Sequence, residues 1–205
     1  MSTTLTLTQL ASAIATAPER AAVALRATMP AAGIVAVGGV KQHFQTSTGP
    51  DGIPWRPLAH PRPRGGEKPL LDTGQLRNSV SATTTDDTIT LRANGPGARL
   101  HQLGGVITPK RARALAIPIT TEARRAGSPR RFPRPLFAGK GPKGGYLAES
   151  KGKGKRAKVV VHYLLRTSVP IPARPFMGFS VETMAKIESL VTGRIVAAVA
   201  ELGGG

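Results

Sequence analysis

Apolar residues near the N-terminus recur at intervals of three and four, the spacing of one face of an α-helix. This pattern predicts a short helix over residues 6–17. Pro18 suits the first turn of a second helix, which should end before Pro30 because the residue preceding a proline disfavours helical backbone. A third helix is expected over residues 31–45, although its three glycines weaken it.

The clearest periodic pattern lies at the C-terminal end. Ser180 is placed to cap a helix that continues to about Leu202, with Glu182 at the positive end of the helix dipole. The predicted apolar face of this helix recurs every three or four residues and contains Val181, Met184, Ile187, Val191, Ile195, Val199 and Leu202. We therefore expect an amphipathic helix that packs on a sheet.

Between these ends, the pattern changes to the alternation of β-strands. Residues 76–84 and 88–92 predict a hairpin that turns at two adjacent aspartates, and residues 99–103 and 115–119 are shorter extended candidates. Pro118 would place the latter at a sheet edge or at a strand end. Residues 159–166 are apolar nearly throughout, which indicates a strand buried on both faces or against a partner.

Residues 120–158 show almost no periodicity and are rich in proline, glycine and basic residues. A connection of this length is uncommon in a compact domain unless it has a function. The chain is thus predicted to have an α+β fold: a small, mainly antiparallel sheet with N-terminal helices, a long basic loop or hairpin arm over residues 110–158, and the C-terminal helix packed on the sheet. We divide it into an N-terminal helical region, residues 1–47, and an α+β domain, residues 48–205.

Composition narrows the function classes. The chain has 205 residues and no cysteine, which excludes disulfides, thiolate catalysis and cysteine-based zinc sites. The N-terminus lacks the charged start and the continuous apolar stretch of a signal peptide. The longest mostly apolar run, residues 31–40, is about half a membrane span, so we expect a soluble protein without a membrane partner.

Positive charge is concentrated in one segment. Of a formal net charge of +18, residues 110–158 carry +13, since they hold two acids against fifteen basic residues. These candidate contact residues are Lys110, Arg111, Arg113, Arg124, Arg125, Arg130, Arg131, Arg134, Lys140, Lys143, Lys151, Lys153, Lys155, Arg156 and Lys158. The segment could bind nucleic-acid phosphates, bind an acidic protein surface, or be a solvated loop. It offers few aromatic residues for base stacking and no recognition helix, so sequence-specific reading of nucleic acid is not expected.

No pattern of reactive residues predicts catalysis. The four histidines lack the spacing of a zinc helix, and the eleven carboxylates are scattered. Residues 139–143 depart from a phosphate-binding loop because a proline interrupts them, and residues 178–180 lack the second glycine of a serine elbow. We therefore predict no enzymatic activity, no cofactor and no metal site.

Four short motifs follow one another in a fixed order: GPDGIPWRPL at residues 49–58, LLDTGQLRNS at 70–79, LHQLGG at 100–105 and IPARPFMG at 171–178. Together they resemble the virion-morphogenesis and tail-completion family of Mu-like tailed phages, over about residues 43–202. The resemblance implies a structural protein of the tail or neck of the virion. Such a protein would form a ring, by the resemblance a hexamer, at the head–tail junction and bind neighbouring neck and tail proteins. It would be present in the host cytoplasm during assembly.

Five residues of these motifs are candidates for a structural role: Trp55, Gly74, His101, Arg174 and Phe176. Gly74 would let the chain turn into a strand, and Trp55 could cover one end of the sheet. Arg174 is the one charge in an apolar strip and should pair with a carboxylate or with backbone carbonyls. For His101 and Arg174, structural and functional roles both remain open.

Two functional classes remain to be distinguished: an assembly protein and a nucleic-acid-binding protein. In the first, the basic segment is ordered by contacts with neighbouring subunits, and a ring around the channel could also contact packaged DNA without reading its sequence. In the alternative, the chain is a nonspecific nucleic-acid-binding protein that uses residues 110–158. Salt separates the two, because binding to free nucleic acid weakens steeply as salt rises.

Overall fold

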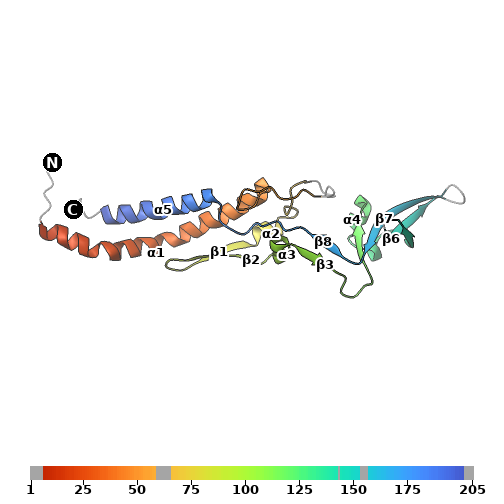
Figure 1. Cartoon of the computed structure of the whole chain (residues 1–205), viewed down its shortest axis with the longest axis horizontal. Coiled ribbons are helices and arrows are strands. Elements are labelled where there is room, and N and C mark those ends of the chain that lie inside the picture. The colour runs from red at the N-terminus through yellow and green to blue at the C-terminus, as the bar shows by residue number, and fades with distance from the viewer. Residues whose placement is uncertain (1–6, 59–65, 143, 153–156, 201–205) are drawn as a thin grey trace. The chain divides into compact units, whose positions relative to one another are not determined.

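The computed structural model describes residues 7–58, 66–142, 144–152 and 157–200. The chain forms two compact units, each of which is described separately (Figure 1). We call the first the helical unit; it comprises Met1–Arg56, Lys68–Ala98 and Arg174–Gly205. The second, which we call the basic unit, comprises Pro57–Glu67 and Arg99–Ala173.

In the helical unit, two long helices pack on each other, and the first of them also packs on a hairpin. Helix α1 spans Leu7–Thr46, and helix α5 spans Val181–Ala200. The hairpin consists of β1, Val80–Thr84, and β2, Ile89–Ala93, and a single turn of helix, α2 (Gln75–Asn78), precedes it. Helix α1 lies between α5 and the hairpin (Figure 1). The α+β class and the hairpin are confirmed.

The prediction of several N-terminal helices is wrong, because α1 continues through both Pro18 and Pro30. Each proline removes one backbone hydrogen bond, which costs about 3 kcal/mol in a helix interior. Around Pro30, packing on α5 and on the hairpin opposes that cost: Met29, Ala32 and Ala36 are all buried. Tertiary contacts therefore override the local break signal.

The continuous helix changes one expectation about membranes. By length and composition, the part of α1 from Ala15 to Thr46 could cross a membrane, whereas the three shorter helices could not. A single helix of this kind does not establish a membrane span, since core helices of soluble proteins meet the same criterion of length and composition.

The C-terminal helix is capped as predicted, because the Ser180 hydroxyl accepts a hydrogen bond from the Thr183 amide at 3.2 Å. The predicted face residue Leu202 lies outside the described residues. However, α5 packs mainly on α1 rather than on a sheet, which corrects the predicted arrangement. The two helices approach closely at Gly39, where a Cβ atom would overlap the Thr183 side chain. A glycine that weakens an isolated helix thus permits the main helix–helix contact.

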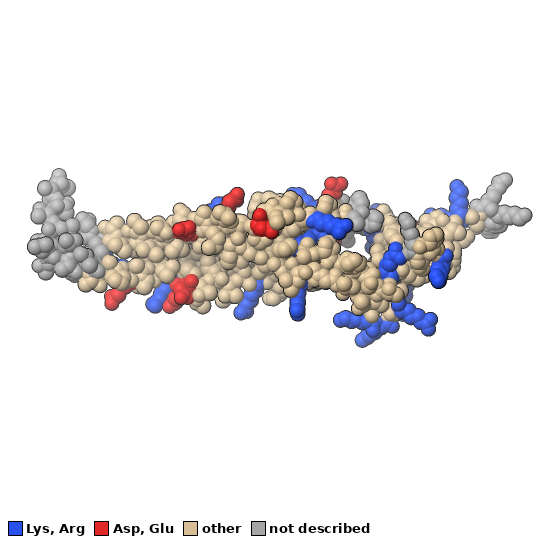
Figure 2. Space-filling view, viewed as in Figure 1, with Lys and Arg blue, Asp and Glu red and all other residues tan. Residues whose placement is uncertain are grey.

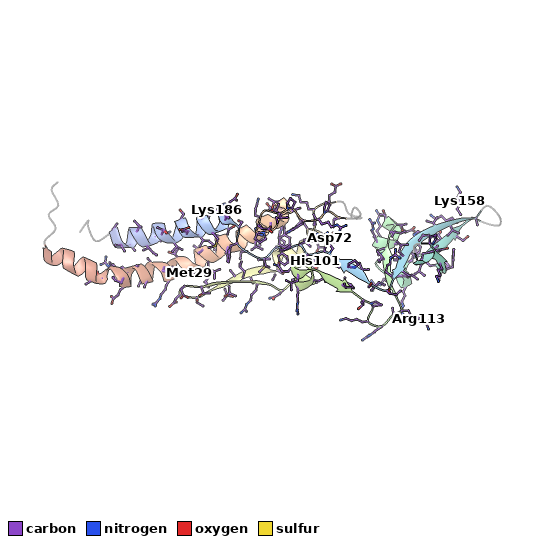
Figure 3. All side chains as sticks on the ribbon, in the orientation of Figure 1. Met29, Asp72, His101, Arg113, Lys158 and Lys186 are labelled. Carbon is purple, nitrogen blue, oxygen red and sulfur yellow. The ribbon has the colours of Figure 1, made fainter. Side chains whose placement is uncertain are left out.

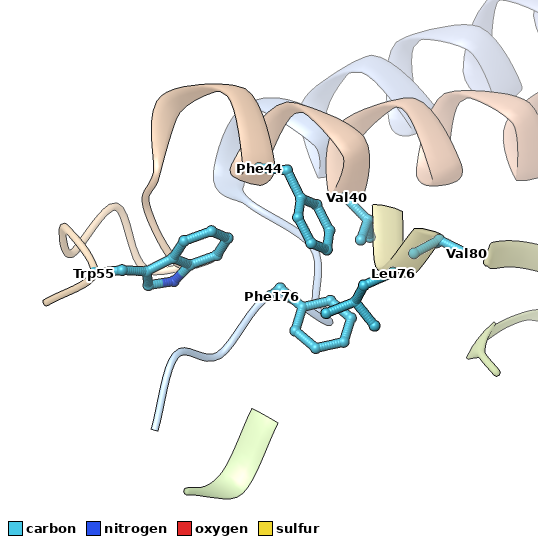
Figure 4. Packing of buried hydrophobic residues seen from close by; sticks show 6 residues of the cluster. All are labelled: Val40, Phe44, Trp55, Leu76, Val80 and Phe176. Carbon is cyan, nitrogen blue, oxygen red and sulfur yellow. The ribbon is translucent and has the colours of Figure 1, made fainter. Parts of the chain in front are cut away.

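Aromatic residues from separate segments form the core of the helical unit (Figure 4). The Phe44 ring on α1 lies edge-to-face with Trp55 at a centroid distance of 5.7 Å, and 5.2 Å from Phe176. Leu76 and Val80, at the start of the hairpin, complete the contact. Apart from Val80 in β1, these residues come from the first, second and fourth sequence motifs and from the end of α1.

The basic unit contains two antiparallel sheets. Strand β3, Gly105–Ile107, pairs with β8, Val169–Ile171. A four-stranded sheet has the order β4-β7-β6-β5. Its strands are β4 (Leu115–Pro118), β5 (Phe137–Gly141), β6 (Gly144–Lys151) and β7 (Lys158–Arg166). The predicted edge strand with Pro118 is confirmed. The strand predicted over residues 159–166 also forms and is the inner strand β7, but only His162 and Tyr163 of it are buried, so it is not buried on both faces along its length.

Residues 110–158 do not form an irregular loop. They contain β4, β5, β6, the helix α4 (Thr121–Ala126) and a short 3₁₀ segment, η1 (Pro129–Arg131). The expected hairpin is limited to β5 and β6, because β4 pairs with β7 and α4 contacts both of those strands, so the segment as a whole is not a projecting arm. Local propensity could not predict β5 and β6, because glycine holds two of the five positions in β5 and the first two of the eight in β6. The Tyr146 ring fills the space over Gly139, where a Cβ atom would overlap it.

Two shorter predictions are also wrong. Residues 99–103 belong to a helix, α3 (Ala98–Leu103), instead of a strand. Gly74 adopts φ 78° and leads into helix α2, so the strand begins at Val80 rather than directly after the glycine. In both cases the segment is one turn or two long, too short for periodicity to separate helix from strand.

The contact at Gly39 predicts opposite effects for two glycine substitutions. Gly39→Ala should lower the free energy of unfolding of the helical unit by up to about 2 kcal/mol, since overpacking costs about 1–3 kcal/mol and outweighs the gain in helix propensity of about 1 kcal/mol. Gly193→Ala, in the interior of α5 with open space around it, should raise it by about 0.5–1 kcal/mol. Urea unfolding followed by fluorescence of Trp55, the only tryptophan, measures both. Equal shifts of the same sign would contradict this account of the helix contact.

Candidate functional site

The first and fourth motifs meet in the helical unit. The Trp55 indole donates a hydrogen bond to the Pro175 carbonyl at 2.8 Å, and the Arg174 guanidinium donates through Nε to the Arg56 carbonyl at 3.0 Å. His43 Nδ1 lies 2.9 Å from the Phe176 carbonyl, and because a carbonyl only accepts, this nitrogen carries the hydrogen. A backbone carbonyl is one of the two kinds of partner expected for Arg174. The side chains of Trp55, Arg174 and His43 are buried and hold backbone in place.

Close backbone approach explains the turn residues of these motifs. Gly52 donates its amide to the Gly49 carbonyl at 3.0 Å, which closes the predicted turn. A Cβ atom on Gly178 would lie 2.7 Å from a ring carbon of Pro50. Trp55 packs on the Phe44 ring instead of covering the end of a sheet.

The third motif belongs mainly to the basic unit. His101 is half-buried in α3. Gly104 follows this helix, and a Cβ atom there would lie 2.8 Å from the Ala173 nitrogen. The motif therefore sets the start of β3, which pairs with β8 at Gly105 and Ile171.

Within the basic unit lies a cluster of charged residues that no sequence pattern predicted. Arg134 Nη2 lies 2.6 Å from Glu122 Oε2, and Arg134 Nε lies 2.7 Å from Glu149 Oε1. The second of these is an ion pair rather than an aligned hydrogen bond. His162 Nε2 lies 3.1 Å from Glu149 Oε2, and its Nδ1 lies 2.8 Å from the Thr120 hydroxyl, which also caps α4. We call these five residues the Arg134 cluster.

Elements far apart in the sequence supply this cluster, which explains why spacing did not reveal it. Glu122 comes from α4, Glu149 from β6 and His162 from β7, while Arg134 follows η1. One signal was present: His162 interrupts the otherwise apolar run of β7. A polar residue buried in such a strand requires a hydrogen-bond partner, which here is Glu149.

The surroundings of the cluster favour its charged forms. The hydrogen bond from Arg134 holds the pKa of Glu122 below its usual value, although desolvation opposes this. Burial alone would raise the pKa of Glu149, but the ion pair with Arg134 and the hydrogen bond from His162 outweigh it and the pKa is lowered. The same two carboxylates raise the pKa of Arg134.

Aromatic packing closes one side of the cluster. The Phe132 ring lies 4.4 Å from the His162 ring, and the Arg134 guanidinium lies over Phe132 at 5.4 Å. The Tyr163 hydroxyl donates to the Ala123 carbonyl at 3.1 Å, and burial raises the pKa of Tyr163. The cluster is thus joined to the small apolar core of the basic unit.

The ligand atoms of Glu122, Glu149 and His162 all lie within 4.8 Å of one another, so together they could hold a metal ion. Arg134 already supplies a cation to both carboxylates. A metal ion would have to displace this guanidinium, and the arrangement is better explained as an ion-paired network that fixes α4 against the sheet.

The predicted basic contact residues separate into three groups. Arg134 belongs to the ion-paired cluster, and Arg124 is half-buried. Lys143, Lys153, Lys155 and Arg156 lie outside the described residues. The remaining nine are exposed: Lys110, Arg111, Arg113, Arg125, Arg130, Arg131, Lys140, Lys151 and Lys158. Figure 2 shows Lys and Arg side chains projecting from the basic unit, and Figure 3 labels Arg113 and Lys158 among them.

A comparison with protein families identifies the chain. Residues 5–134 match the phage virion morphogenesis family, and this match covers more than half of the sequence. The chain belongs to the phage virion morphogenesis family. No curated protein and no solved structure matches it.

Membership in the phage virion morphogenesis family indicates a structural, virion-associated protein of a bacteriophage. The matched residues contain the first three motifs. The fourth motif, at residues 171–178, and helix α5 lie beyond the matched segment. The narrower assignment to Mu-like phages stays a prediction.

The Arg134 cluster predicts acid sensitivity of the basic unit. Because both carboxyl pKa values are lower in the folded protein, the stability they confer is present above their unfolded value of about 4.3 and is lost as pH falls through the lowered values. Thermal midpoints should therefore fall in acid when followed by near-UV circular dichroism of Tyr146 and Tyr163, the only tyrosines and both in this unit.

Glu149→Gln should reduce this acid-induced fall by roughly half, because it removes one of the two shifted carboxyls. The control is Glu19→Gln on the exposed surface of α1, which should leave the acid dependence unchanged. If Glu149→Gln retains the full dependence, the cluster does not control the acid stability of the unit.

Proposed function

We propose that this chain is a structural protein of the head–tail junction, a neck or tail-completion protein, which assembles as a ring and finishes the tail end for attachment to the head. The observation that carries the proposal is the family match over residues 5–134. The four motifs support it, because they extend the resemblance to the tail-completion branch of such proteins.

The placement of the motif residues is consistent with a scaffold that serves assembly. Trp55, Arg174 and Phe176 are buried and fix backbone segments to one another. The titratable groups that do converge among the described residues, in the Arg134 cluster, are paired with one another rather than directed at a substrate cavity. This arrangement favours a structural role over catalysis.

The first test is the composition and morphology of particles. In the phage or prophage that encodes this chain, mass spectrometry of purified virions should detect the protein. Deletion of its gene should leave heads and tails unjoined or tails misfinished in electron micrographs, and expression of the chain in trans should restore particles. Absence from virions together with normal particles after deletion would refute the proposal.

A second candidate function is nonspecific binding of nucleic acid, either as the main role or as contact with packaged DNA. The charge distribution favours it. The basic unit has nineteen Lys or Arg residues and three acids, whereas the helical unit has ten and eight. Lys110, Arg111 and Arg113 lie together in the exposed loop between β3 and β4. A cluster of this kind attracts phosphate backbones irrespective of sequence.

Salt dependence tests this second candidate. If the loop contacts DNA phosphates, the logarithm of the association constant for duplex DNA should fall linearly with the logarithm of salt concentration. Lys110→Gln combined with Arg111→Gln should reduce the slope by about 2, or about 1 for each contact removed. The matched control removes two exposed charges of the helical unit, Arg92→Gln with Lys186→Gln, and should not change the slope. If the chain does not bind free duplex DNA at low salt, this second candidate is refuted and the basic surface is expected to bind a protein partner instead.

A further inference from the structure

Helix α1 carries an apolar stripe that no described residue of its own unit covers. The side of α1 at Ala24, Thr28 and Gly39 faces α5, and the side at Gly33 and Val37 faces the hairpin. Successive helix residues are rotated by about 100°, so a third side remains. Six exposed residues without charge form this α1 stripe: Val23, Ala27, Pro30, Ala31, Ile34 and Gly38.

The α1 stripe is long enough for a helix–helix contact. Its spacing of three and four residues is that of a coiled-coil seam, and it extends for about 22 Å along the helix. Ile34, at the centre, has 75% of its surface exposed. An apolar groove of about 610 Å³ follows one edge of the stripe, between Ile34 and Gly38 on α1 and Ala82 and Thr84 on β1.

Helix α5 has a second uncovered stripe. The apolar face predicted from its sequence is turned partly away from α1, because Thr183, Leu190 and Arg194 occupy the side that faces that helix. Val181 is 85% exposed, Met184 50% and Val196 59%. We define the α5 stripe as Val181, Met184, Ala185, Glu188, Thr192 and Val196, of which Glu188 is the one charged member.

The two stripes cannot cover each other within one chain. α1 and α5 run antiparallel, since Gly39 lies near Thr183 and Ala24 lines a groove with Ala198. Both helices are right-handed but run in opposite directions, so successive residues turn in opposite senses when the two helices are viewed from one end. The α1 stripe therefore lies on one side of the plane that contains both helix axes, and the α5 stripe lies on the other side. One flat surface, such as a lipid bilayer, could therefore cover only one of them.

We propose that the α5 stripe of one copy packs on the α1 stripe of the next copy, so that identical subunits associate side by side through their helical units. This rests on the proposed ring function. The contact joins two different surfaces, which makes it heterologous, and such contacts generate closed rings when the rotation between subunits closes.

Charge and shape agree with this pairing. Basic residues flank the α1 stripe, with Arg20 beyond one end and Lys41 beyond the other. Helix α5 exposes the acids Glu182 and Glu188, and its exposed cations Lys186 and Arg194 lie outside the α5 stripe. If the neighbouring α5 repeats the antiparallel register of the own-chain pair, Met184 lies over Gly38, Glu182 lies near Lys41 and Glu188 lies opposite Ile34. A Cβ atom on Gly38 would have nothing within 4 Å, so this position offers space for a side chain such as methionine.

The test is the association state of the full chain in solution. Analytical ultracentrifugation of the purified protein should show assemblies larger than a dimer of the 21.4 kDa subunit. Ile34→Glu on the α1 stripe and Met184→Glu on the α5 stripe should each weaken assembly by about 100-fold or more, because each adds a second carboxylate to a contact that already contains Glu188. Ile53→Glu is the control: Ile53 is 63% exposed in a loop outside both stripes, and this variant should assemble normally.

Mixing the two variants distinguishes the proposed contact from other pairings. Ile34→Glu keeps an intact α5 stripe and Met184→Glu keeps an intact α1 stripe, so an equimolar mixture should form a one-to-one dimer that grows no further. Misfolded variants could not pair in this way. A symmetric contact between two α1 stripes predicts instead that Met184→Glu alone forms dimers.

Three results would overturn the inference: a wild-type chain that stays monomeric at all concentrations, variants that assemble like the wild type, or a mixture that forms no dimer. Flotation of monomeric protein with phosphatidylcholine vesicles would assign the α1 stripe to lipid and would also overturn it. None of these measurements uses virions. Failure of self-association is therefore distinguishable from failure of the head–tail role, which particle composition tests.

Discussion

Hydrogen bonds to the backbone of residues 175–176 fix the chain segment before α5 to the C-terminal end of α1. The Trp55 indole and the His43 ring approach the carbonyls of Pro175 and Phe176, and the Phe176 ring packs against Phe44. These contacts join the end of α1 to the segment that leads into α5. Since α5 begins only a few residues later, its position along α1 follows from this joint and from the close approach at Gly39. The hairpin completes the same apolar core.

The basic unit has to fold while it carries a large excess of positive charge. The Arg134 cluster uses one of these cations internally: Arg134 is shared by Glu122 and Glu149, so the only two acids of residues 110–158 both stabilise the fold. The other described cations of the segment are left largely at the surface. Arg134 is neutralised within the unit, whereas the surface cations repel one another. A surface of this kind is suited to binding a polyanion or an acidic protein.

A virion morphogenesis protein has to be stable alone and still associate with others. The separation of roles between buried and exposed residues is consistent with this demand. Buried aromatic and hydrogen-bonded motif residues maintain the scaffold, whereas the α1 stripe, the α5 stripe and the exposed cations remain available for partners. Ile34 and Val181 illustrate the point, because large apolar side chains this exposed contribute little to the stability of a single chain.

The sequence by itself determined the α+β class, the cap at Ser180, the hairpin around Asp86 and the family, because capping, alternation and motif order are local properties of the chain. Only the tertiary structure decided that α1 continues through Pro30, that β5 and β6 are strands despite their glycines, and that α5 packs on α1. The Arg134 cluster was equally inaccessible, since its members come from four separate elements. Packing energies and ion pairs between distant residues exceed local propensities of about 1 kcal/mol, and no local pattern records them.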